Sequence, residues 1–220
     1  MSKLSLRQIL TPIATLAIIC FMYFGPLTRT IFENIILSLV IIAANYFEYK
    51  GKPFAALGFQ RENFTAKNLL VLAPLTAFGL FVVYVFVLVP GIEMLTGVPI
   101  DYSSMIQVKG DLPTAIIWLL IVWATAAFGE EIIFRGYLMR QFVKFFEDSK
   151  ISLAINILKF CSFFEYMHMQ QGITGQLVAG STGALLSIVF YRRQYDLWFM
   201  VVLHDSFNTL GILSFNFGLA

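Results

Sequence analysis

Seven apolar runs divide this chain, and each is close to the about 20 residues that one membrane-crossing helix needs. Their approximate limits are 9–27, 31–47, 68–89, 113–134, 151–169, 173–190 and 197–217. Hydrophobic residues make up 59% of the chain and charged residues only 13%, whereas about a quarter of the residues in a soluble domain are charged. The sequence therefore predicts an all-α polytopic membrane protein with about seven transmembrane helices, or eight if one short or re-entrant segment is added.

The stretches between these runs are too short to hold a second hydrophobic core. Residues 1–220 are therefore predicted to form a single membrane domain. The first run follows Lys3 and Arg7, as the apolar part of a signal peptide would, but it is longer than such a part, and we interpret it as an uncleaved first span. The net charge of +2 is too small to indicate a nucleic-acid partner.

The positions of Lys and Arg predict the orientation in the membrane. With a cytoplasmic N-terminus, twelve of them lie in inside segments and only Arg29 and Lys109 lie in outside segments. Such an excess marks the cytoplasmic side, so we expect a plasma-membrane protein with its N-terminus in the cytoplasm and an odd number of spans. The twelve are Lys3, Arg7, Lys50, Lys52, Arg61, Lys67, Arg135, Arg140, Lys144, Lys150, Arg192 and Arg193.

Small residues inside the apolar runs predict packing rather than chemistry. Cys20 and Cys161 lie in separate runs, and we interpret them as buried small hydrophobic residues, not as a disulfide or a metal pair. Four small residues recur at intervals of four in the sixth run, a spacing that lets helices approach closely. These are Gly175, Ala179, Gly183 and Ser187.

Four protonatable residues lie within or against the apolar runs: Glu130, Glu131, His168 and His204. An ionisable side chain at membrane depth costs several kcal/mol by most estimates, and such residues usually mark functional sites. Two adjacent glutamates in AAFGEEIIFRGYL bring no packing benefit. The sequence therefore predicts a polar site built inside the membrane.

Helical spacing suggests different roles for the two glutamates. Glu131 and Arg135 are four residues apart, share one helix face and can form an ion pair. Glu130 is turned by about 100° from Glu131 and lacks that partner. We therefore expect Glu131 to orient the site and Glu130 to be its reactive carboxylate.

Two later segments bring further polar groups. If the fourth and fifth runs form a hairpin about residue 149, Glu130 and His168 lie at the same level. His204 and Asn208 are four residues apart on one face of the last run, and an imidazole and an amide can both donate hydrogen bonds to a developing oxyanion.

Three motifs carry a resemblance to a known family. GEEIIFRG (Glu130, Glu131 and Arg135), FEYMH (ending at His168) and HDSFN (His204 and Asn208) resemble, in order, the motifs of the CAAX prenyl protease and bacteriocin-processing (CPBP, or Abi) family of intramembrane proteases. The resemblance covers about residues 113–217, which would form the protease-like core.

The resemblance implies an endopeptidase that cuts lipidated or membrane-associated peptides or proteins. It assigns Glu130 as the catalytic glutamate, Glu131 and Arg135 as its motif partners, and His168, His204 and Asn208 as the remaining site residues. Glu165 departs from the family pattern, which usually has a small residue after the phenylalanine. It could hydrogen-bond the imidazole of His168 or remain solvated at the interface.

Alternatives remain open at this point. His168, His204 and Glu130 would also form the two-His, one-Glu ligand set of a catalytic zinc centre, although HExxH is missing and we favour a metal-free site with no cofactor. A family relative could instead be a non-catalytic immunity or peptide-binding protein. A proton-coupled transporter is less favoured, because the polar residues lie only in the second half of the chain.

Overall fold

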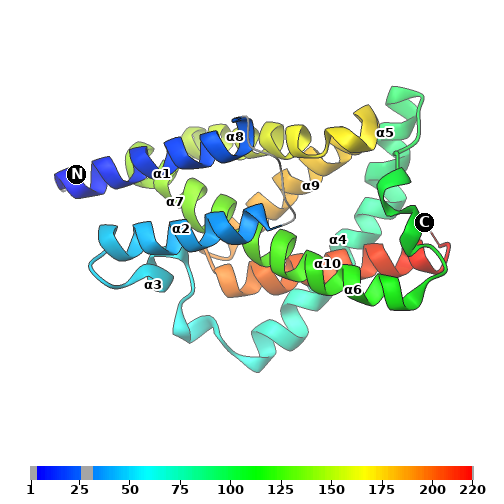
Figure 1. Cartoon of the computed structure of the whole chain (residues 1–220), viewed down its shortest axis with the longest axis horizontal. Coiled ribbons are helices and arrows are strands. Elements are labelled where there is room, and N and C mark those ends of the chain that lie inside the picture. The colour runs from blue at the N-terminus through cyan, green and yellow to red at the C-terminus, as the bar shows by residue number, and fades with distance from the viewer. Residues whose placement is uncertain (1–3, 26–31, 220) are drawn as a thin grey trace.

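The computed structural model describes residues 4–25 and 32–219, and these residues form helices and connecting turns (Figure 1). The α-helices are α1 (Leu6–Phe24), α2 (Glu33–Glu48), α3 (Pro53–Leu57), α4 (Ala73–Val83), α5 (Val89–Thr96), α6 (Leu112–Val122), α7 (Arg140–Phe146), α8 (Lys150–Met167), α9 (Gly172–Arg192) and α10 (Leu197–Asn216). The 3-10 helices are η1 (Arg61–Asn63), η4 (Ser103–Val108) and η6 (Met169–Gln171), and the π-helices are η2 (Lys67–Leu72), η3 (Tyr84–Leu88) and η5 (Trp123–Met139).

The described residues of the seven predicted runs are almost entirely helical, which confirms the all-α prediction. Residues 26, 27 and 31 of the first two runs lie outside the described residues. Within the described residues, five helices are long and apolar enough to cross a membrane. They are Leu6–Phe24, Lys67–Thr96, Leu112–Phe146, Met169–Arg192 and Leu197–Asn216. Many large apolar side chains are exposed on their outer surfaces, such as Leu70, Phe86 and Ile117, as expected where lipid replaces water. The chain is therefore an integral membrane protein with at least five candidate spans.

The other two predicted spans, α2 and α8, do not reach the same length and apolarity. α2 has 16 residues, which extend over about 24 Å of helix. α8 has 18 residues but includes Lys150, Lys159 and Glu165. The count of seven spans therefore stays a prediction.

The third run extends beyond its predicted end. The sequence places a break at Pro90 and Gly91, but helix continues through them to Thr96. A π-helical segment precedes each of the two prolines in this run, η2 before Pro74 and η3 before Pro90. A widened turn accommodates a proline ring that would otherwise clash with the preceding turn. Gly97 then ends the helix in a left-handed conformation, with φ of 74°.

The fourth run is also longer than predicted. Instead of ending near residue 134, helix continues without a break from Leu112 to Phe146. Arg135, counted above among the inside charges, is fully buried in this helix, because it pairs with Glu131. It therefore says nothing about orientation, and eleven of the twelve inside charges remain for that argument.

Side-chain caps explain where several helices begin. The side chain of Asp111 accepts a hydrogen bond from the Thr114 amide at the start of α6, Ser149 caps α8, and Asp196 caps α10. Each cap satisfies an amide that has no partner within its own helix. The hydroxyl and amide of Thr114 also hold the pKa of Asp111 below its ordinary value.

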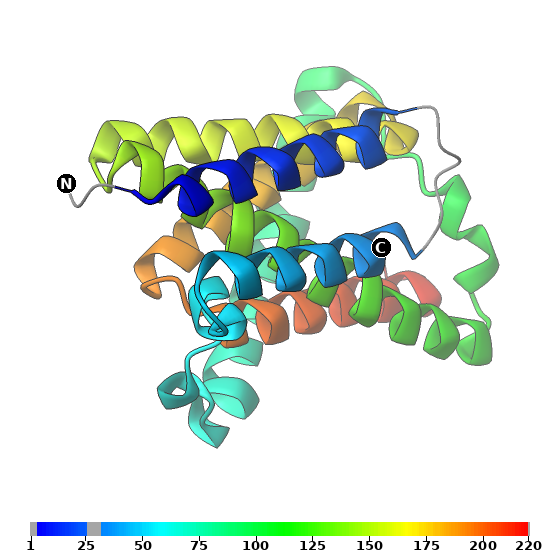
Figure 2. The same cartoon turned by 60° about the vertical axis from the view of Figure 1, so that its left-hand side comes forward.

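The helices pack in pairs around η5. In Figures 1 and 2, α1 lies alongside α8, and α2 lies beneath α1 and against η5. α8 packs along α9, where the absence of a side chain at Gly183 lets Phe164 approach: a Cβ there would lie 3.1 Å from Cγ of Phe164. The predicted packing role of this small residue is confirmed.

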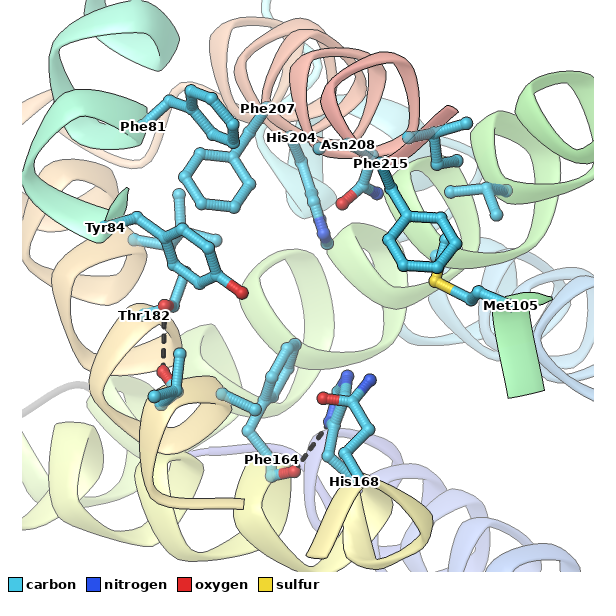
Figure 3. A pocket seen from close by; sticks show the side chains of 18 of the residues that line it. Phe81, Tyr84, Met105, Phe164, His168, Thr182, His204, Phe207, Asn208 and Phe215 are labelled. Carbon is cyan, nitrogen blue, oxygen red and sulfur yellow. Dashed lines mark hydrogen bonds between the residues drawn. The ribbon is translucent and has the colours of Figure 1, made fainter. Parts of the chain in front are cut away.

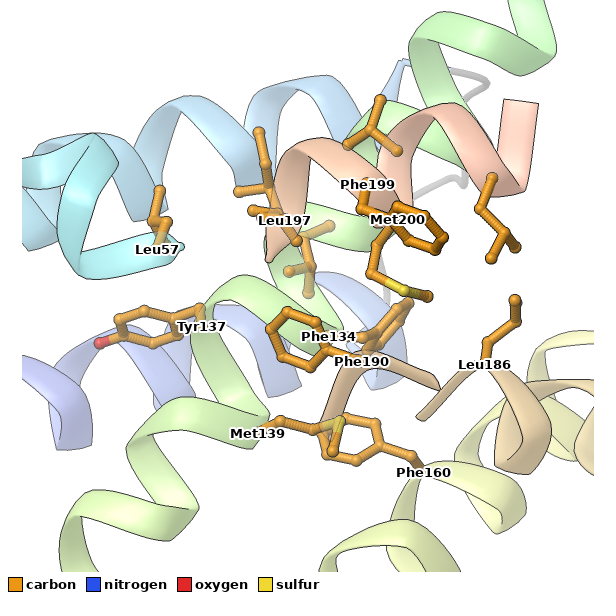
Figure 4. Packing of buried hydrophobic residues seen from close by; sticks show 14 of the residues in the cluster. Leu57, Phe134, Tyr137, Met139, Phe160, Leu186, Phe190, Leu197, Phe199 and Met200 are labelled. Carbon is orange, nitrogen blue, oxygen red and sulfur yellow. The ribbon is translucent and has the colours of Figure 1, made fainter. Parts of the chain in front are cut away.

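The main apolar core lies where η5, α9 and α10 meet (Figure 4). Phe134 and Tyr137 from η5 pack there with Phe190 from α9 and with Leu197 and Met200 from α10. All five side chains are at most 1% exposed. This core holds two of the segments that carry predicted site residues, η5 and α10, in fixed relative positions. Cys20, in contrast, is exposed on α1, so the prediction that it is buried was wrong; both cysteines are free.

Candidate active site

A cavity of about 290 Å³ lies among α4, η3, η4, α6, η5, α8, η6, α9 and α10. Aromatic and aliphatic side chains form most of its wall, with Phe81 and Tyr84 on one side and Met105 and Phe215 on the other (Figure 3). Concave, mostly apolar cavities with a few polar groups are the usual form of a small-molecule or peptide site.

Four of the six predicted site residues line this cavity: Glu130, His168, His204 and Asn208. His204 and Asn208 point into it from α10, and His168 points into it from the opposite wall, at the end of α8 (Figure 3). Glu130 comes from η5. Residues separated by up to 78 positions in the sequence thus line one cavity. Together they bring a carboxylate, two imidazoles and an amide into it.

Glu131 and Arg135 lie behind the cavity and are fully buried. Arg135 Nη1 donates to Glu131 Oε1 over 2.8 Å, as the spacing predicts, and Nδ1 of His204 lies 2.9 Å from the same oxygen. A carboxylate can only accept, so Nδ1 of His204 carries the hydrogen. Glu131 therefore joins the first and third motifs and sets the orientation of the His204 ring.

Arg135 also contacts the wall that holds His168. Its guanidinium lies 4.9 Å from the ring centroid of Phe164 and donates to the carbonyl of Gly183 over 3.3 Å. The Phe164 ring in turn stacks on the His168 imidazole, with centroids 5.6 Å apart and planes 20° apart. The buried ion pair thus supports both histidines, one by a hydrogen bond and the other through an aromatic ring.

The hydrogen bond of His168 decides its tautomer. Its Nδ1 lies 2.8 Å from the backbone carbonyl of Phe164, and a carbonyl oxygen can only accept. The hydrogen therefore sits on Nδ1, and Nε2 of the neutral ring is a proton acceptor. This is the state that a group assisting in deprotonation of water requires.

Asn34 is a site neighbour that the sequence analysis missed. Its Nδ2 lies 3.5 Å from Oε1 of Glu130, at the long limit of a hydrogen bond. The two residues are 96 positions apart, and no motif connects them. The one available signal was an amide within the second apolar run, since buried polar groups in such runs need partners.

The glycines that flank the first motif allow neighbouring elements to approach. A Cβ at Gly129 would lie 2.8 Å from Cβ of Asn34, and a Cβ at Gly136 would lie 2.8 Å from a methyl group of Leu197. The motif itself lies in a π-helix, a conformation that is rare and is found frequently at functional sites. The spacing GEEIIFRG is therefore partly a packing requirement.

Glu165 does not hydrogen-bond the His168 imidazole, whose Nδ1 is taken by the Phe164 carbonyl. Its carboxylate instead lies 3.5 Å from Sγ of Cys161 and packs against α9 at Gly180, where an added Cβ would lie 2.4 Å from its Cγ. The position of the side chain is decided by the space that glycine leaves. The side chain is therefore half-buried between α8 and α9 and is not bonded to the imidazole.

The zinc alternative can be compared with the geometry. Across residues 4–25 and 32–219, no three His, Cys, Asp or Glu side chains are grouped closely enough to hold a metal ion. Nδ1 of His204 is already bound to Glu131, and Nδ1 of His168 faces a carbonyl. His168, His204 and Glu130 line one cavity, and hydrogen bonds at Nδ1 leave Nε2 of each ring as the nitrogen that could bind a metal. The metal-free site therefore stays a prediction.

Comparison with known proteins gives one family. Residues 112–210 match the Rce1-like family, described as type II CAAX prenyl endopeptidase Rce1-like. The match covers just under half of the chain and includes all six predicted site residues. No curated protein and no solved structure matches the chain. This segment, which carries all three motifs, is thus similar to the Rce1-like type II CAAX prenyl endopeptidases, a family of proteases.

Proposed function

We propose that this protein is an intramembrane endopeptidase that hydrolyses peptide bonds in lipidated or membrane-associated peptides. Residues 113–217 form its catalytic core within one membrane domain. The observation that carries the proposal is that a carboxylate, two imidazoles and an amide line one largely apolar cavity. Hydrolysis of an amide needs an activated water, donors for the oxyanion and a proton for the leaving nitrogen.

The carboxylate and the first histidine act on the water. Glu130 accepts one proton from a water molecule, and Nε2 of His168, a free acceptor, assists. The water oxygen attacks the scissile carbonyl carbon and forms a tetrahedral intermediate with a negatively charged oxygen. Collapse of this intermediate breaks the C–N bond, and the proton held by Glu130 passes to the leaving amine. The enzyme returns to its starting state.

The α10 residues stabilise the negatively charged oxygen. Asn208 donates from its amide, and His204 donates from Nε2 when its ring is protonated on both nitrogens. The carboxylate of Glu131, 2.9 Å from Nδ1, holds the ring in this orientation. Donors fixed before the reaction act most strongly where water is excluded, and loss of one donor costs about 10²–10³ in kcat in other hydrolases.

The substrate class follows from the wall of the cavity and from the family. Phe81, Tyr84, Phe207 and Phe215 offer aromatic surface to a bound segment, and the lining residues include no lysine or arginine in the described part of the chain. Such a wall favours an apolar peptide or its lipid. The family name adds prenylated proteins as the expected substrates.

The test uses the purified full-length protein in phospholipid vesicles with a quenched fluorescent peptide that carries a C-terminal farnesylated CAAX sequence. The wild-type protein should release a fragment whose new terminus is located by mass spectrometry. Glu130→Gln keeps the shape but removes the base, so turnover should fall by about 10²–10⁴. Glu62→Gln is the matched control, because this glutamate is exposed and lies outside the cavity.

Two results would contradict the proposal. Turnover of Glu130→Gln at the wild-type rate would remove this carboxylate from the chemistry. Saturable binding of farnesylated or unmodified membrane peptides without any cleavage would favour a non-catalytic peptide-binding or immunity protein instead.

A further inference from the structure

The Glu130 carboxylate is supported by helices that lie outside the family match. Within the part of the chain that the structure describes, its one hydrogen bond comes from Nδ2 of Asn34 on α2. α2 ends at Glu48, well before residue 112, where the match begins. Hydrogen bonding by residues of the three motifs therefore does not fix the orientation of the Glu130 carboxylate.

Tyr23 of α1 determines which way the Asn34 amide faces. Its hydroxyl lies 2.7 Å from Oδ1 of Asn34, and the Tyr23 side chain is 2% exposed. With the hydroxyl donating to Oδ1, Nδ2 is turned toward Glu130 as a donor. The chain of donors runs in one direction, from phenol to amide to carboxylate.

The backbone around Asn34 is fitted against the start of the first motif. Gly129 has no side chain where a Cβ would meet Cβ of Asn34 at 2.8 Å. One turn along α2, the Ser38 hydroxyl lies 2.7 Å from the Asn34 carbonyl and 3.3 Å from the Gly129 carbonyl. α2 and η5 are thus held together at Gly129, the residue that precedes Glu130.

We propose that Tyr23 and Asn34 are positioning residues, which hold Oε1 of Glu130 through Asn34 so that its other oxygen is directed to the water and the scissile bond. In this role Asn34 contacts neither the water nor the scissile bond. It acts only through Glu130. The proposal assigns a function to α1 and α2. The expected effect on catalysis rests on the proposed protease activity.

The kinetic test compares Asn34→Ala with Asn45→Ala in the vesicle assay described above. Asn45 is a matched control because it is a buried asparagine of the same helix whose side-chain amide donates within that helix, to the Ile41 carbonyl. Asn34→Ala should lower kcat about 10–100-fold, because small misplacements of a reacting group cost about that much. KM should stay within about twofold, and Asn45→Ala should leave both constants unchanged.

Two further substitutions separate hydrogen bonding from packing. Asn34→Asp keeps the shape but replaces the donor by a like charge, so it should be at least as slow as Asn34→Ala. Tyr23→Phe removes only the hydroxyl and should reduce kcat by a smaller factor, about 3–10-fold, because the amide remains. Full activity of Asn34→Asp would overturn the proposal.

A stability measurement makes the contact testable even if no peptide is cleaved. Thermal midpoints are compared for wild type, Asn34→Ala, Glu130→Gln and the double variant, and the same cycle is run with Asn45→Ala. Groups in contact give non-additive changes, while distant groups add. We expect the Asn34 cycle to deviate from additivity by at least about 1 °C and the Asn45 cycle to be additive.

The two readouts distinguish the possible failures. Non-additivity without any cleavage by the wild-type protein would retain the contact and reject the protease proposal. Cleavage with an additive Asn34 cycle and an unchanged kcat would retain the protease and reject the positioning role.

Discussion

Glu131→Gln should destabilise the protein far more than the same substitution one residue earlier. Glu131 and Arg135 are both 0% exposed and are 2.8 Å apart. Removing one charge of a buried pair leaves the other uncompensated, which typically costs about 3–5 kcal/mol. For a chain of this size that corresponds to a thermal midpoint lowered by about 6–20 °C. Glu130→Gln removes no buried counter-charge and should shift the midpoint by only about 1–4 °C.

A double variant separates stability from activity. Glu131→Leu combined with Arg135→Met replaces the pair by apolar side chains, a change that is often neutral or stabilising in buried pairs. We therefore expect the midpoint to return toward wild type. Peptide cleavage should stay low, because Nδ1 of His204 loses its acceptor and the ring is no longer held toward the cavity.

The measurements are thermal unfolding of the purified protein in detergent, followed by intrinsic fluorescence, and the vesicle cleavage assay. A wild-type midpoint for Glu131→Gln would show that the pair contributes little to the fold. Full cleavage by the double variant would show that His204 needs no carboxylate behind it. Either result would refute the reasoning from the buried pair.

Three further predictions follow from other features. Gly183→Val should lower both the thermal midpoint and kcat, because a Cβ there lies 3.1 Å from Phe164, which stacks on His168. Gly79→Val is the control, since nothing lies within 4 Å of that position. Equal effects of the two substitutions would argue against the contact between Gly183 and Phe164. Prolonged chelation should leave cleavage unchanged, since the described residues group no three metal-ligating side chains; restoration of a chelated enzyme by zinc would contradict this. A cysteine placed at Lys52 in an otherwise cysteine-free chain should not react with an impermeant thiol reagent added outside cells. The predicted cytoplasmic N-terminus and a spanning α2 put this position inside. Labelling from outside would mean that α2 does not cross.

Local features of the fold could be predicted from the sequence because they depend on neighbours along the chain. Apolar run length placed helices at each of the seven runs over the residues that the structure describes, although the number of spans stays a prediction. The pairing of Glu131 with Arg135 followed from a spacing of four residues. The ends of the third and fourth runs were placed too early, because Pro90 and the charged residues after Phe134 mark a break in most sequences, whereas here widened turns and a buried ion pair allow helix to continue.

The candidate site was predicted as a set of residue types but not as an arrangement. The spacing of His204 and Asn208 indicated a shared face, but nothing in it showed that Nδ1 of His204 binds Glu131, 73 positions away. A hydrogen bond from Glu165 to His168 was one of two expectations for this residue. Its side chain instead packs into the space that Gly180 leaves on α9. Contacts between helices depend on their crossing and on small residues, which periodicity along one helix does not report.

What the sequence by itself determined was which segments are helical and which polar residues those segments must accommodate in an apolar setting. The tertiary structure alone decided which of these groups share a cavity, which tautomer His168 adopts, and that Asn34, bonded to Tyr23, lies against Glu130. The physical reason is one of range. Helix formation and burial depend on residues a few positions apart, while hydrogen-bond partners inside a membrane protein come from whichever helix packs closely enough to satisfy a buried polar group.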